Sequence, residues 1–175
     1  GTGTTLIYTA PAGESMTECD WSYDEAKIAV KTNNINGYNS NIRILDMVGN
    51  VLTTIVNNSI GAVGGINFSV DGKKFIFCQD VSNYQDSSYR QLDTRIFLYE
   101  FTTATLTDLS DLSKKTLGTN DLDPRFSPNN AEIIFTNTSN DGISPKNIQK
   151  ISLDLSLQNL QRTTLFTNAE MPDWQ

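Results

Sequence analysis

A motif of about 12 residues occurs three times in this chain and constrains its fold more than any other feature of the sequence. Each copy places an aromatic residue and a serine before a short polar turn, and an apolar run follows the turn. The copies are CDWSYDEAKIAV at 19–30, INFSVDGKKFIF at 66–77 and PRFSPNNAEIIF at 124–135. A fourth copy begins at Pro172 and reaches Trp174, so the aromatic residues lie 47, 58 and 48 positions apart.

Each repeat carries the signals of four antiparallel strands. A turn such as Asp71-Gly72 between apolar runs is typical of a β-hairpin, because hairpin turns require positive φ. An apolar strand follows each turn, at 28–30, 75–78 and 133–136. A third strand is expected at 42–45, 96–99 and around 148–153, and a fourth at 51–56, 105–109 and 163–167. The unit is therefore a four-stranded antiparallel meander of about 50 residues.

A single meander cannot bury both of its faces. Packing such sheets radially around an axis solves this problem and leaves only short edges exposed. We therefore predict an all-β chain that forms a β-propeller of four-stranded antiparallel blades, with three blades in this chain. The alternative is an ordinary β-sandwich in which the aromatic–serine pairs recur by coincidence.

The repeat boundaries divide the chain into segments. We expect blade 1 at 19–65, blade 2 at 66–123 and blade 3 at 124–171, with an outer strand of a preceding blade in 1–18 and the start of the next blade in 172–175. Both ends then lie at the same phase of the repeat, which is typical of half of a six-bladed ring. Two apolar blade faces would be exposed in such a half-ring, so we predict a homodimer whose copies complete the ring.

The repeat resembles that of TolB-type β-propellers, whose blades open with Pro-x-(Trp/Phe)-Ser-Pro-Asp-Gly. The third copy is the most similar, with Pro124-Arg125-Phe126-Ser127-Pro128-Asn129. The second copy keeps Phe68-Ser69 and Asp71-Gly72 without the prolines, and the first keeps Trp21-Ser22 and Asp24. The resemblance implies that Trp21, Phe68 and Phe126 pack in the core between blades.

The same resemblance implies a function and a location. It indicates a non-enzymatic module that recognises protein or peptide partners at the cell envelope, in the periplasm, on the cell surface or after secretion. A repeat shared by many proteins is specific for fold and not for function.

Loop lengths indicate where a partner would bind. Consecutive connections of a meander lie at opposite ends of the sheet, so each blade has two sets of loops. The first connections are tight, at 23–26, 70–73 and 128–131, and we call their end the tight-turn face. The second connections are long, at 33–41, 80–94 and 137–147, and they share what we call the long-loop face with the inter-blade links. Long loops on a rigid scaffold favour binding, so we predict the binding site there.

The candidate binding residues come from two places. Tyr and Arg are frequent interface anchors, and the long loops supply Tyr38, Tyr84, Asp86, Tyr89 and Arg90. The positions directly before the repeat aromatics are Asp20, Asn67 and Arg125, which we expect at the axial mouth of the same long-loop face. These three side chains either meet a ligand in the channel or cap strand ends, and the long loop at 80–94 is alternatively a solvated insertion.

Charge and composition exclude several function classes. The net charge is −7 and no run of Lys and Arg exceeds a pair, so we expect no nucleic-acid binding and no adhesion to anionic membranes. No apolar run approaches the ~20 residues that span a bilayer, so we expect no direct membrane insertion. The chain has no histidine and no nucleophile-elbow or HExxH motif, so we predict that it is not an enzyme.

We expect no cofactor and no metal. Ca²⁺ takes six to eight oxygen ligands, and the carboxylate pairs Asp121/Asp123 and Asp108/Asp111 give it no support. Cys19 and Cys78 could form a single disulfide, but two free thiols, one of them buried in a strand, agree better with their positions in the repeat.

Two further functions stay open at this level. The chain could be the propeller domain of a larger envelope or secreted enzyme, such as a propeller-gated peptidase, whose catalytic residues lie elsewhere. It could also be a glycan-binding propeller that uses Tyr38, Tyr84 and Tyr89 as stacking platforms.

Overall fold

The computed structural model describes residues 3–84, 88, 90–156 and 159–174. In this part of the chain, twelve strands form three four-stranded antiparallel sheets, each with its strands in chain order. Blade 1 consists of β1 (Glu14–Trp21), β2 (Ile28–Asn34), β3 (Ser40–Leu45) and β4 (Val51–Ser59). Blade 2 consists of β5 (Val63–Phe68), β6 (Lys74–Asp80), β7 (Thr94–Glu100) and β8 (Thr105–Asp108). Blade 3 consists of β9 (Thr119–Phe126), β10 (Glu132–Ser139), β11 (Asn147–Ser152) and β12 (Arg162–Thr167), and the short helix α1 (Leu109–Leu112) links blades 2 and 3.

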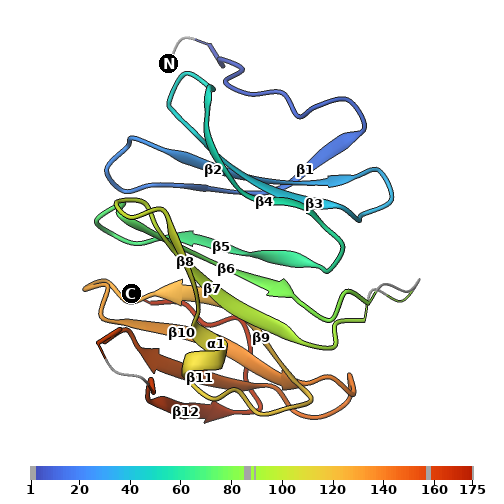
Figure 1. The fold of residues 1–175 in the computed structure, drawn as a ribbon, viewed down its shortest axis with the longest axis vertical. Helices are drawn as coiled ribbons and strands as arrows, with labels where there is room; N and C mark the ends of the chain where they lie inside the picture. The colour runs from blue at the N-terminus through green and yellow to red at the C-terminus, as the bar shows by residue number, and fades with distance from the viewer. Residues whose placement is uncertain (1–2, 85–87, 89, 157–158, 175) are drawn as a thin grey trace.

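The three sheets stack face to face, with blade 2 between its neighbours (Figure 1). The prediction of an all-β chain with three blades of a propeller is therefore confirmed. The first strands begin at Glu14, Val63 and Thr119, which is five, three and five residues before the boundaries expected at 19, 66 and 124.

The recurring serine has a structural role in the first turn of every blade. The Ser69 hydroxyl accepts a hydrogen bond from the Lys74 amide at 2.9 Å and donates one to the Lys74 carbonyl at 3.0 Å. In the other two first turns, the hydroxyls of Ser22 and Ser127 likewise accept hydrogen bonds from the amides five positions later, those of Lys27 and Glu132. Within each turn one residue has positive φ, as expected for a tight hairpin: Glu25, Gly72 and Asn130.

The core lies in two layers between the sheets. The first layer joins blades 1 and 2 and includes Phe68, and the second joins blades 2 and 3 and includes Phe126. Successive residues Phe75, Ile76 and Phe77 are all fully buried, because both faces of β6 are covered by neighbouring blades. Phe68 and Phe126 therefore each pack against the blade that precedes their own.

This rule explains one wrong prediction. Trp21 was expected in the core, yet 54% of its surface is exposed. The side chain belongs to blade 1, and the described residues contain no blade before it for it to pack against. The core assignments of Phe68 and Phe126 are confirmed by their burial.

The chain ends cover part of the outward faces of the two terminal blades. Residues 3–13 contain no strand, but they run along the first sheet (Figure 1). The Ile7 carbonyl packs so closely on Gly49 that a Cβ at Gly49 would lie 1.9 Å from the carbonyl oxygen. At the other end, the Met171 amide donates to Thr136 Oγ1 at 3.2 Å. Short terminal segments therefore shield part of the two apolar blade faces that were expected to be exposed.

Candidate functional site

The long-loop face carries three of the predicted binding residues that the structure describes. Tyr38 lies in the β2–β3 connection, and its amide donates to Asn34 Oδ1 at 2.9 Å. Tyr84 and Arg90 lie in the β6–β7 connection, with the Arg90 guanidinium 5.8 Å from the centroid of the Tyr84 ring. This contact places a cation over the aromatic face. Asp86 and Tyr89, which were predicted for the same loop, lie outside the described residues.

Buried polar side chains anchor both ends of the β6–β7 loop. The carboxylate of Asp80 is buried and accepts hydrogen bonds from the amides of Ser82 at 2.8 Å, Leu92 at 3.0 Å and Asp93 at 3.2 Å. A carboxylate that accepts several backbone N–H groups fixes the two loop ends relative to each other. The loop therefore leaves the sheet from a rigid base.

Asn120 adds a second anchor from the first strand of blade 3. Its Oδ1 accepts from the Thr94 amide at 2.8 Å, and its Nδ2 donates to the Gln91 carbonyl at 3.0 Å. The base of the loop is thus held by residues of two blades.

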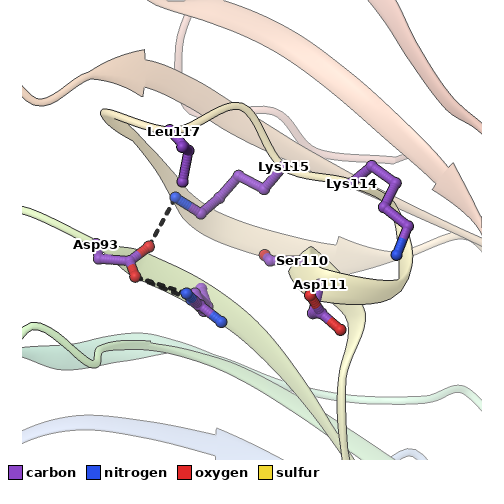
Figure 2. Close-up of a pocket in the computed structure, with 7 residues that line it drawn as sticks. Asp93, Ser110, Asp111, Lys114, Lys115 and Leu117 are labelled. Carbon is purple, nitrogen blue, oxygen red and sulfur yellow. Dashed lines mark hydrogen bonds and ion pairs between the residues drawn. The ribbon is translucent and has the colours of Figure 1, made fainter.

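A charged pocket of about 190 Å³ adjoins this base, and Figure 2 shows the side chains around it. Asp93 bridges two cations there: its Oδ2 lies 2.7 Å from Arg95 Nη2, and its Oδ1 lies 2.8 Å from Lys115 Nζ. Arg95 also pairs with Asp108 at 3.1 Å. The pocket is lined by Asp93, Arg95, Ser110, Asp111, Lys114, Lys115 and Leu117.

The pKa of Asp93 reflects these contacts. Burial raises the pKa of Asp93, but hydrogen bonds and the positive charges of Arg95 and Lys115 outweigh it, so the pKa lies below its usual value. Asp93 in turn raises the pKa of Arg95. Asp93 and Arg95 are therefore both charged at neutral pH. The sequence analysis did not identify this pocket, although its acidic members lie in or beside loops that were recognised as long.

Asn67 and Arg125 lie at the opposite end of the molecule from the one predicted. Both line a groove together with Tyr23, Val70 and Pro128, which belong to the first turns of the three blades. They therefore lie on the tight-turn face and not at the mouth of the long-loop face. The reason is the strand direction, because each of these positions comes at the end of a first strand, directly before the tight turn.

Asp20 and Asn67 connect neighbouring blades. Asp20 Oδ2 accepts from the Phe68 amide at 2.7 Å and from Asn67 Nδ2 at 3.4 Å. Asn67 Oδ1 accepts from the Phe126 amide at 3.0 Å in the same way. An acceptor before each repeat aromatic thus binds the amide of the next one. Arg125 breaks the series, because a guanidinium has no acceptor.

Two carboxyl groups on β1 are partly buried by the neighbouring strand β5. Burial raises the pKa of Glu18 and of Asp20, although the Ile66 amide donates to Glu18 and the Phe68 amide to Asp20. The positive charge of Arg125 lowers both values in part.

Two of the four carboxylates that the sequence offered for Ca²⁺ take part in ion pairs. Asp121 pairs with Arg162 at 2.7 Å and Asp108 pairs with Arg95. Over the described ranges, no group of three or more His, Cys, Asp or Glu residues is arranged to hold a metal ion. Cys19 and Cys78 are both free thiols, and burial raises the pKa of Cys78 to about 12.

Comparisons with known proteins agree on the fold. No protein-family model matches this chain, and no curated protein matches its sequence. Among solved structures, TolB from Acinetobacter baumannii matches with a TM-score of 0.55 and 21% identity, over 85% of this chain and 32% of that one. The putative TolB from Agrobacterium tumefaciens matches with a TM-score of 0.62 and 16% identity, over 88% of this chain and 52% of that one.

Propellers of enzymes are similar as well. Prolyl oligopeptidase B from Galerina marginata matches with a TM-score of 0.62 and 11% identity, over 95% of this chain and 25% of that one. The chain spans about a third of the length of one of the two TolB chains that it matches and about half of the other. Among the residues described, no helix is both long and apolar enough to cross a membrane. The chain has the fold of a TolB-like β-propeller and forms three of its blades.

Proposed function

We propose that this chain is a non-enzymatic TolB-like propeller module that binds a protein or peptide partner through its long-loop face. The observation that carries the proposal is the doubly anchored β6–β7 loop, whose base is held by the buried side chains of Asp80 and Asn120. A loop with a fixed base presents its side chains at a lower entropy cost on binding than a free loop does. The TolB-like fold supports a location at the cell envelope, in the periplasm, on the surface or after secretion.

The composition of this face favours a protein partner. Tyr84 and Arg90 offer the residue types that dominate protein interfaces, and the charged pocket at Asp93 and Arg95 adds hydrogen-bonding groups beside them. A glycan platform needs an accessible ring face, whereas the guanidinium of Arg90 lies over the ring of Tyr84. The structure therefore supports protein or peptide recognition better than glycan stacking.

A comparative pull-down tests the proposal. The chain and its Tyr84→Ala and Arg90→Ala variants are immobilised and incubated with an envelope extract of the source cells. Tyr23→Ala, on the opposite face, is the matched control. We expect a partner that binds the unmodified chain and the Tyr23→Ala control equally and loses at least tenfold in affinity with either loop variant. Identical binding by all four proteins would show that the long-loop face is not the site.

A propeller domain of a larger peptidase is the second candidate. It is favoured by the match to prolyl oligopeptidase B, which covers nearly the whole of this chain and a quarter of that enzyme. The test is the sequence of the parent gene: a GxSxG motif followed by Asp and His downstream supports it, and an open reading frame that contains only propeller repeats contradicts it.

Completion of the ring by a second copy stays a proposal as well. Trp21 on blade 1 and Phe166 on blade 3 remain 54% and 62% exposed beside the terminal segments, so both terminal blades retain an apolar surface. Light scattering on the purified chain is expected to give twice the mass of 19.4 kDa. A stable monomer at that mass would contradict the dimer.

A further inference from the structure

The only Asn-Gly pair in the sequence, Asn36-Gly37, lies at the tip of the β2–β3 connection. β2 ends at Asn34 and β3 begins at Ser40, so the pair belongs to a turn outside the strand ladder. Both residues are exposed, and Gly37 has φ of +83°, which glycine adopts without strain. The pair is therefore open to water on the long-loop face.

This pair joins an electrophilic carbon to an unhindered backbone nucleophile. The side-chain amide carbon of Asn36 precedes the Gly37 nitrogen by one residue, so attack of that nitrogen on Cγ closes a five-membered ring. Glycine has no Cβ that could obstruct the approach. Every other asparagine is followed by a residue with a side chain, and the exposed Asn50 is followed by the β-branched Val51. The sequence thus favours ring closure at Asn36.

Hydrogen bonds hold the turn around this pair, and one of them uses the attacking nitrogen. Asn34 Oδ1 accepts from the Asn36 amide at 3.0 Å and from the Tyr38 amide at 2.9 Å. Asn33 Nδ2 donates to the Gly37 carbonyl at 2.9 Å. The Gly37 amide itself donates to the Asn34 carbonyl at 2.9 Å. Because the turn is exposed, water can replace this last bond while the others keep the pair in place.

The two Asp-Gly pairs of the chain are less suited to the same ring closure. Asp71 Oδ1 accepts hydrogen bonds from Ser69 Oγ at 2.7 Å and from the Lys73 amide at 3.1 Å. Asp141 Oδ1 accepts from the Ser144 amide at 2.9 Å. Such hydrogen bonds favour the ionised carboxylate, which is a poor electrophile. A neutral side-chain amide, as in Asn36, does not have this disadvantage.

We propose that Asn36 is a site of spontaneous deamidation in the folded chain. The Gly37 nitrogen gives its proton to hydroxide and attacks Asn36 Cγ, and the bond from Cγ to the side-chain nitrogen breaks. That nitrogen takes a proton from water and leaves as ammonia, which leaves a succinimide ring. Water then opens the ring: attack at Cγ gives aspartate, and attack at the backbone carbonyl carbon of residue 36 gives isoaspartate. One water is consumed, one ammonia is released, and no atom changes its oxidation state.

The reaction would alter the long-loop face in two ways. Either product adds one negative charge to the turn beside Tyr38. Isoaspartate also adds a methylene group to the main chain between the Asn36 and Tyr38 amides, which both donate to Asn34 Oδ1. The proposal concerns the chain itself, so it does not depend on the function proposed for this face.

Timed incubation of the folded chain in neutral and in mildly alkaline buffer tests the site. The tryptic peptide 32–43 is compared by chromatography and mass spectrometry with synthetic peptides that carry aspartate or isoaspartate at position 36. We expect both products to accumulate, and faster at higher pH because the Gly37 nitrogen must lose its proton. The rate is expected to be at least about tenfold higher than at Asn50, which precedes Val51. Asn36→Gln, whose longer side chain cannot close a five-membered ring, is expected to remove the modification from this peptide.

Incubation in urea separates the effect of the turn from that of the sequence. Exposed loops open locally at little free-energy cost, so we expect the rate in the folded chain to lie within about tenfold of the rate in the unfolded chain. A folded chain that stays unmodified at Asn36 while the unfolded chain deamidates there would overturn the proposal, because the turn would then protect the pair. An equal mass gain of peptide 32–43 in the Asn36→Gln variant would also overturn it, because the reaction would then lie at another asparagine.

Discussion

A buried ion pair within blade 3 provides the sharpest test of how this structure is held together. Asp121 on β9 has no exposed surface, and it accepts hydrogen bonds from both terminal nitrogens of Arg162 at 2.9 and 2.7 Å. Ser110 Oγ at 2.6 Å and Asn137 Nδ2 at 2.8 Å donate to the same carboxylate. The Arg162 guanidinium also lies 4.9 Å from the centroid of the Phe135 ring. The carboxylate therefore has four donors from three side chains and is fully paired.

Removing one partner leaves the other charge buried and unpaired. Loss of one member of a buried pair costs about 3–5 kcal/mol, a large part of the ~5–15 kcal/mol by which a domain is stable. We expect Asp121→Leu and Arg162→Met each to lower the free energy of unfolding by about 3–5 kcal/mol. The double variant replaces both charges with apolar groups, so its cost is expected to fall at least about 2 kcal/mol below the sum of the single costs.

Urea unfolding monitored by tryptophan fluorescence measures these free energies. The exposed pair of Lys146 and Glu170 is the control, because surface ion pairs contribute about 0–1 kcal/mol, and Glu170→Ala is expected to stay in that range. A cost below about 1 kcal/mol for Asp121→Leu, or simple additivity in the double variant, would refute the reasoning that the pair is desolvated and coupled.

Three further predictions address titration, reactivity and backbone geometry. Burial raises the pKa of Glu18 in the folded state, so the wild-type chain loses stability as pH rises through that pKa. We therefore expect the Glu18→Gln variant to become more stable relative to wild type between pH 4 and pH 7. A stability difference between the two proteins in urea unfolding that does not change with pH would contradict this. Burial raises the pKa of Cys78 to about 12, so a thiol reagent is expected to label only Cys19 in the native state and both cysteines in urea. Rapid labelling of both cysteines in the native state would disprove the burial of Cys78. Gly65 has φ of +61°, and a Cβ there would lie 2.6 Å from Pro124 Cδ. We therefore expect Gly65→Ala to lower the free energy of unfolding by at least about 1 kcal/mol in thermal unfolding. An unchanged Tm would show that β5 and β9 can move apart at this point without cost.

The sequence predicted the placement of the strands because their signals are local. The turn chemistry at Ser69 to Gly72 recurs in three copies, and the apolar run that follows it can be recognised without knowledge of the neighbours. The aromatic residues Phe68 and Phe126 were assigned correctly to the core because the repeat resembles that of TolB-type propellers.

The binding residues were predicted less well, and the reason differs between the two groups. Asn67 was assigned to the long-loop face, although the sequence contained the signal that places it on the tight-turn face. Asn67 lies two positions before Ser69, whose side chain closes the tight turn. The pocket at Asp93 and Lys115 could not be found in this way, because its members come from segments more than 20 positions apart in the chain. Only the packing of the β6–β7 loop against the link between blades brings them together.

The amino-acid sequence by itself determined the repeat, the strand order within each blade and the tight first turns, since all of these depend on residues within about 50 positions of one another. The tertiary structure alone decided which faces are covered and which charges are paired. The exposure of Trp21 depends on which blade lies next to which, and the pairing of Asp121 with Arg162 joins the first and last strands of blade 3 across 41 positions. Neighbouring blades are joined by side chains about 50 positions apart, such as Asp20 with the Phe68 amide, and that distance carries no local signal.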